Sequence, residues 1–258
     1  MKNPWVKGVS VLIVAGVAVG VNVLGYTKNK EAQQTQRIEQ AVTTISNQQK
    51  QLETIQSAIK AVYLDETEDV LKPNVTVESV AKIENNLNRL KVTAADFSLS
   101  ANDLPAEVES LSQQKAQLQT QLQIVSDKVK LQQQLLQLFT NETVNFEEVV
   151  NNVIIQPKAT LKEIDAIREA VTVLPGKQWQ TSMNEYLDYA EAQVNRANNL
   201  RESFEEMLDD GTVTDEATYE RYLLAAESIA QVRNPELKET FQTQLDQIGE
   251  QLGFGSLY

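Results

Sequence analysis

A stretch of twenty residues near the start of the chain, 8–27, contains no charged side chain and is bordered by Lys7 and Lys28. A helix of that length, rising 1.5 Å per residue, is about 30 Å long, which is the thickness of the hydrocarbon core of a bilayer. The stretch therefore predicts a single-pass transmembrane anchor over residues 8–27, behind a short cytoplasmic tail formed by residues 1–7.

A secretory signal peptide is the alternative interpretation of the same residues. Its apolar region would be shorter, about 7–15 residues, and small residues would mark a cleavage site. The length of the apolar run and the lack of a clear A-x-A sequence favour an uncleaved anchor. Lysines are nearly balanced on the two sides, so the positive-inside rule leaves both orientations open.

Two glycines inside this stretch, Gly16 and Gly20, form a G-x-x-x-G pattern. Small residues at that spacing let two membrane helices approach closely. The pattern makes these glycines candidates for membrane dimerisation and predicts a parallel homodimer.

The charge of the chain limits its partners. The formal net charge is -13, and the first 30 residues contribute four lysines and no acid, so residues 31–258 carry -17. A body this acidic repels the phosphates of nucleic acid, so no nucleic-acid partner is expected.

Histidine and cysteine are both absent. The commonest general base and metal ligand and the best thiol nucleophile are therefore missing, and we predict no enzyme activity, no cofactor and no metal.

A heptad pattern follows the apolar stretch, with isoleucine or leucine at every seventh residue and further apolar residues at the alternate positions. It predicts a juxtamembrane coiled-coil helix within residues 28–72. This seam either pairs with a second copy in the homodimer or packs on later helices of its own chain. Its members are Ile38, Ile45, Leu52, Ile55, Ile59 and Val62.

Three short helices follow, and their sequences repeat one pattern. Thr76, Thr160 and Asp215 are predicted N-caps, each followed by apolar residues at offsets of four, seven, eleven and fourteen. A capping oxygen satisfies a free N–H group, and these offsets place one apolar stripe on one helix face. Such a unit buries its stripe only against flanking long helices, so the pattern indicates an internal repeat.

The predicted fold is therefore all-α: the transmembrane helix, then an elongated rod of small helical bundles that share long helices. The first module covers residues 73–156, the second and third modules cover 157–252, and 253–258 form a frayed end. In the long helix that Pro105 opens, the inward stripe is interrupted by Lys115 and Gln132. The apolar members of this stripe are Val108, Leu111, Leu118, Leu122, Val125, Val129, Leu136 and Phe139.

Acidic clusters in the turns are interpreted without metal. The Asp209–Gly211 segment lacks the ligand spacing of a calcium-binding EF-hand loop. The acidic residues between Asp65 and Asp69 are typical of a solvated turn. The tyrosine pairs Tyr186/Tyr189 and Tyr219/Tyr222 are predicted to pack in the core.

The repeated phrase of a long helix, an acidic turn and a Thr-containing helix start is carried by residues 75–78, 159–163 and 213–216. It resembles the helical modules of surface proteins in low-GC Gram-positive bacteria, and is similar in style to the extracellular helical part of MapZ-type division proteins. The resemblance implies a body outside the cell. The sequence departs from that family in having only about seven residues before the membrane stretch.

The functional prediction is a non-catalytic, membrane-anchored, extracytoplasmic scaffold or interaction protein of the bacterial cell envelope. Its partners would be other envelope proteins or the cell wall. Two alternatives stay open: a cytoplasmic coiled-coil division regulator in the manner of EzrA, and a ligand-binding ectodomain that acts through a partner.

Overall fold

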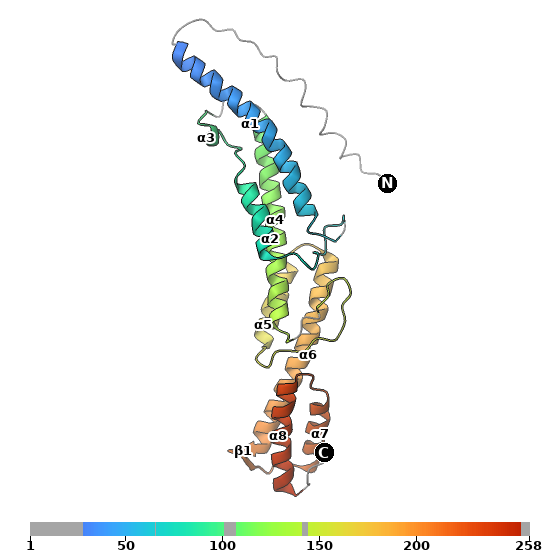
Figure 1. Ribbon diagram of the computed structural model, residues 1–258. Coiled ribbons are helices and arrows are strands. Elements are labelled where there is room, and N and C mark those ends of the chain that lie inside the picture. Colours follow the sequence, from blue (N-terminus) through green and yellow to red (C-terminus); the bar gives the residue numbers. More distant parts are fainter. Residues whose placement is uncertain (1–27, 65, 101–106, 141–143, 254–258) are drawn as a thin grey trace.

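The computed structural model describes residues 28–64, 66–100, 107–140 and 144–253, and these form the almost wholly helical chain shown in Figure 1. The all-α prediction is confirmed. Among the described residues one pair of strands is present, each of two residues: β1 (Leu208–Asp209) and β2 (Thr212–Val213). The helices are α1 (Lys28–Lys60), α2 (Val77–Asn88), α3 (Ala94–Phe97), α4 (Glu107–Gln137), α5 (Leu161–Thr172), α6 (Lys177–Met207), α7 (Tyr219–Ala230) and α8 (Pro235–Leu252).

No helix in the described ranges is long and apolar enough to cross a bilayer. The predicted cytoplasmic tail and anchor, residues 1–27, lie outside the described residues, as do all but the first residue of the predicted frayed end.

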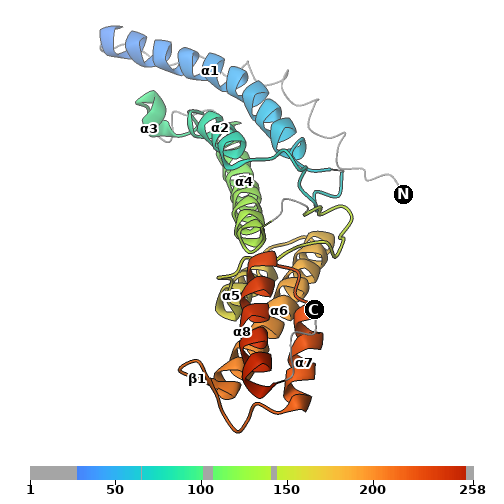
Figure 2. The same cartoon turned by 60° about the horizontal axis from the view of Figure 1, so that its bottom comes forward.

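The helices form three bundles in a row. The first bundle contains α1, α2 and the first part of α4; the second contains the last part of α4, α5 and the first part of α6; the third contains the last part of α6, α7 and α8. Figure 1 shows these bundles stacked end to end, with α1 at one end and α7 and α8 at the other. Figure 2 shows α1 extending past α2 and α3 to its Lys28 end. Because α4 and α6 each belong to two bundles, the bundles follow one another as a rod.

Each long helix ends in the same backbone hairpin. The carbonyls of Val62, Leu138 and Met207 accept hydrogen bonds of 2.9, 2.7 and 3.0 Å from the backbone N–H groups ten, eighteen and seven residues later. Antiparallel pairing of the next residue closes each hairpin: Tyr63 with Leu71, Phe139 with Ile155, and Leu208 with Val213. The three hairpins differ in loop length but join a long helix to a short one in the same way, so the repeat is structural.

Each short helix has twelve residues and begins after a threonine cap. The side-chain oxygens of Thr76 and Thr160 accept backbone hydrogen bonds from Ser79 and Glu163 at 3.2 Å. In the third copy the cap is Thr218, whose oxygen accepts from the Arg221 N–H at 3.3 Å. The threonine hydroxyls thus satisfy N–H groups that the first helical turn leaves unpaired.

The predicted Asp215 cap is wrong by three residues. Asp215 lies inside a turn closed by the hydrogen bond from Ala217 N to Thr214 O, and this turn precedes every short helix. The true phase buries Tyr222 and leaves Tyr219 55% exposed, so the predicted core position of Tyr219 is also wrong. Counted from Thr218, the same four apolar offsets recur.

We expect Thr218→Ala to lower the free energy of unfolding by about 1 kcal/mol, because it removes the oxygen that caps α7. Asp215→Ala is the matched control and should change stability by less than about 0.5 kcal/mol, since Asp215 is exposed in the turn. Urea unfolding followed by circular dichroism measures both. A larger loss for Asp215→Ala than for Thr218→Ala would contradict the cap assignment.

The buried residues form two hydrophobic cores, one in the first bundle and one that runs without interruption through the second and third bundles. The stripe of α4 changes core after Val129. From there Leu131, Leu135 and Leu138 are buried in the second core, whereas Leu136, predicted to face inward, is 38% exposed. Because α4 serves two bundles that lie on different sides of it, one straight stripe does not describe its buried face.

Candidate interaction site

The first junction, where α4 passes from the first bundle into the second, is the place where the two hydrophobic cores are separate. Polar groups take the place of a shared core there. Lys128 on α4 is only 1% exposed, and its ammonium group donates a 2.6 Å hydrogen bond to the backbone carbonyl of Asp69. The same nitrogen lies 5.7 Å from the ring centroid of Tyr63 and 5.1 Å from that of Trp179. The carbonyl and the two aromatic faces offset part of the cost of burying this cation.

Asp69 joins this cluster to the start of α6. Its carboxylate accepts hydrogen bonds from the backbone N–H groups of Gln178 and Trp179 at 2.9 and 3.1 Å. These are free donors of the first turn of α6, and a carboxylate at a helix N-terminus also interacts favourably with the helix dipole. A turn of the first bundle therefore caps a helix of the second bundle, more than a hundred residues away in sequence.

Gly176 makes this approach possible. It precedes α6 with φ +113°, a conformation that side chains disfavour, and a Cβ atom there would lie closer than 3.0 Å to both the Asp69 carboxylate and the Lys128 ammonium. We call Tyr63, Asp69, Lys128, Gly176 and Trp179 the junction latch.

Burial shifts the pKa values of two groups in the latch, Tyr63 and Lys128. It raises the pKa of Tyr63 to about 12, and the nearby Glu68 and Asp69 act in the same direction. Burial lowers the pKa of Lys128, while Asp69 partly opposes that shift. The Trp179 indole N–H is buried and has no hydrogen-bond partner in the described part of the chain. Tyr63, Lys128 and Trp179 are buried, whereas Asp69 and Gly176 are partly exposed at the edge of the latch. The hydrogen bonds of Asp69 join the two bundles across this junction.

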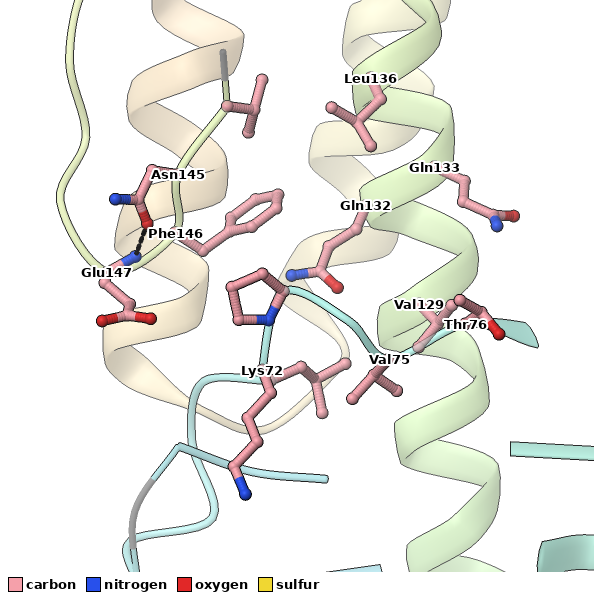
Figure 3. A pocket seen from close by; sticks show the side chains of 13 residues that line it. Lys72, Val75, Thr76, Val129, Gln132, Gln133, Leu136, Asn145, Phe146 and Glu147 are labelled. Atoms are coloured by element: carbon pink, nitrogen blue, oxygen red, sulfur yellow. Dashed lines mark hydrogen bonds between the residues drawn. The ribbon is translucent and has the colours of Figure 1, made fainter. Parts of the chain in front are cut away.

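A surface groove lies beside the latch, with a volume of about 410 Å³. One wall comes from the turn before α2, a second from α4 and a third from the loop before α5. Figure 3 shows Gln132 extending from α4 into the groove and the Phe146 ring reaching in from the loop, while Lys72 points away. The lining residues are Leu71, Lys72, Pro73, Val75, Thr76, Val129, Gln132, Gln133, Leu136, Val144, Asn145, Phe146 and Glu147.

The loop wall is fixed to α6 by hydrogen bonds. The Tyr186 hydroxyl accepts from the backbone N–H of Asn145 at 2.9 Å and donates to its carbonyl at 3.1 Å, and the Ser182 hydroxyl donates to the carbonyl of Phe146 at 3.0 Å. Phe146 also packs edge to face on Tyr186, with 6.0 Å between ring centroids. These contacts hold the loop wall of the groove in place, and the lining of the groove is a mixture of polar and apolar side chains.

The structure places the predicted site residues in two groups. Gly16 and Gly20 lie outside the described residues. Five of the six seam residues, Ile45, Leu52, Ile55, Ile59 and Val62, are buried in the first core, and Ile38, nearer the start of α1, is half-buried. The structure therefore has the second of the two arrangements considered for the seam, packing on later helices of the same chain.

The sequence did not identify the latch. The sequence predicts that Asp69 lies in a solvated acidic turn, whereas its carboxylate caps α6 in the structure. The one signal available was Lys128 beside Val129, a charged residue next to the apolar stripe. No group of three or more acidic residues within the described ranges is arranged to hold a metal ion.

Comparison of the chain with models of protein families, with characterised proteins and with solved structures finds no significant match.

Proposed function

We propose that this protein is a non-catalytic, membrane-anchored spacer and interaction protein of the bacterial cell envelope, with its body outside the cytoplasm. The observation that carries the proposal is the row of three bundles that share α4 and α6. Continuous helices across both junctions keep the bundles in line, since α4 and α6 have 31 residues each and are therefore about 46 Å long.

The position of the first helix supports the anchoring role. α1 begins at Lys28, directly after the uncharged stretch of residues 8–27, and lies at one end of the rod. An anchor there would hold the rod by that end and carry the third bundle away from the membrane. The lack of histidine and cysteine supports a role in binding rather than catalysis.

A homodimer would form through Gly16 and Gly20 in the membrane. Pairing through the seam as well would require α1 to leave the first core, because Ile45 and Leu52 are only 6% and 1% exposed.

Protease treatment of intact cells tests the proposal. We expect the body to be digested from outside without lysis, and small-angle scattering of the body to give a radius of gyration well above the roughly 17 Å of a compact domain of this size. A body protected until the cells are lysed would contradict the extracytoplasmic location and favour the cytoplasmic division-regulator alternative. A compact particle would contradict the spacer role.

A further inference from the structure

The second junction, where α6 passes from the second bundle into the third, has residues equivalent to those around the groove. The two junctions can therefore be compared position by position. The hairpin hydrogen bonds align the ends of α4 and α6, because they make Leu138 and Met207 equivalent. Gln132 and Arg201 each lie six residues before these positions, so they occupy matching places. In the same way, Pro73 and Pro157 each lie three residues before a threonine cap.

An arginine occupies this place in the second junction. The guanidinium of Arg201 donates to the carbonyl of Pro157 at 3.3 Å and to the side-chain oxygen of Asn198 at 2.8 Å. Its Cζ atom lies 6.0 Å from the centre of the Phe241 ring. A carbonyl, a side-chain oxygen and an aromatic face thus contact the guanidinium of the partly buried Arg201, and these are the groups with which a guanidinium interacts favourably.

The groove at the first junction has the same kinds of groups but no cation at the matching place, because the buried ammonium of Lys128 donates instead to the Asp69 carbonyl in the latch. Gln132 replaces the arginine, and within the described part of the chain no side chain donates to the Pro73 carbonyl. Phe146 provides an aromatic ring, and the exposed Glu147 provides a carboxylate. The ammonium of Lys72 is already used, because it donates to the Ala61 carbonyl at the end of α1.

We propose that the groove binds an arginine side chain presented by a partner protein. The guanidinium would take the place that Arg201 fills in the second junction, with Glu147 as its counter-ion and Leu136 against its aliphatic stem. Lysine fits less well, because its ammonium group has neither the planar fork nor the stacking surface. The charge of -17 on residues 31–258 favours the approach of a basic segment. This inference rests on the interaction role proposed above and specifies the chemistry of the partner.

The test uses the full-length chain in nanodiscs and a fluorescent pentapeptide, acetyl-Gly-Leu-Arg-Leu-Gly-amide. Citrulline in place of arginine keeps the shape of the side chain and removes its charge. We expect the arginine peptide to bind and the citrulline peptide to bind at least about tenfold more weakly, because charge-assisted hydrogen bonds are lost. Glu147→Gln should weaken binding of the arginine peptide by a similar factor.

A second measurement uses a variant whose own side chain would occupy the groove. Gln132→Arg should abolish peptide binding and raise the melting temperature, since its guanidinium can reach the Pro73 carbonyl as Arg201 reaches that of Pro157. Gln121→Arg, an exposed position on the same helix, makes the same charge change and should leave binding unaltered.

The proposal is overturned by absence of arginine-peptide binding, by equal binding of the citrulline peptide, or by binding that survives Gln132→Arg. A lower melting temperature for Gln132→Arg would refute the equivalence of the junctions and the proposal with it. None of these results bears on the protease experiment, so failure of the groove and failure of the envelope role are distinguishable.

Discussion

Replacing Gly176 by alanine should lower the free energy of unfolding by about 3 kcal/mol or more. Two costs add at this residue. The backbone has φ +113°, which costs about 1–3 kcal/mol for a residue with a side chain, and the new methyl group meets the Asp69 carboxylate and the Lys128 ammonium. Moving either group breaks the cap of α6 or exposes the cation to a poorer environment. Urea unfolding followed by circular dichroism and by the fluorescence of Trp179 measures the loss.

Gly253→Ala is the matched control. Gly253 also has a positive φ, +75°, but no atom lies within 4 Å of a Cβ built there. Gly253→Ala should lower the free energy of unfolding by about 1 kcal/mol, because only the backbone strain contributes. Equal losses for the two variants would show that contact with the latch adds nothing, and that the junction does not depend on the close approach of Gly176.

Leu87→Asp should destabilise the first bundle by several kcal/mol. Leu87 is fully buried in the first core, so aspartate would place an unpaired carboxylate among apolar side chains and remove the packing of the leucine. Loss of helical signal at a lower urea concentration than for the unaltered chain would measure the effect. Ile167→Asp should lower the free energy of unfolding by a similar amount, because Ile167 is buried in the second core.

Ser57→Asp is the control for both substitutions. Ser57 is exposed on α1, off the seam, and its hydroxyl only donates to the Glu53 carbonyl within the same helix. Its change in stability should stay within about 0.5 kcal/mol. If Leu87→Asp and Ser57→Asp melt at the same temperature, the assignment of the buried faces is incorrect.

The sequence predicted the secondary structure well where one residue type has one dominant role. Thr160 with Glu163 is a capping box in the structure as in the prediction, and the stripe of Ile164, Ile167 and Val171 is buried. The third short helix shows the limit of this reasoning. Asp215 and Thr218 are both good caps, and both give four apolar offsets, so local sequence does not choose between them. The turn that precedes α7 makes the choice.

The candidate site was less predictable than the fold. The glycine pair and the heptads are periodic patterns along the chain, and they predict Gly16, Gly20 and the seam as interaction residues. The latch and the groove have no such period. They bring together the turn before α2, the last third of α4, and either the loop before α5 or the start of α6.

What the sequence determined by itself is therefore local: helix starts, apolar faces, the internal repeat, the acidic charge and the uncharged stretch of residues 8–27. The apolar faces and the first two helix starts depend on neighbours up to fourteen residues apart, which helical geometry relates, and the charge and the uncharged stretch depend on composition alone. The tertiary structure decided where α4 changes core, why Lys128 tolerates burial and why Gly176 must lack a side chain. Those outcomes depend on Asp69 meeting the start of α6, a contact between residues more than a hundred positions apart. No periodicity along the chain specifies it, because it exists only once the bundles have packed.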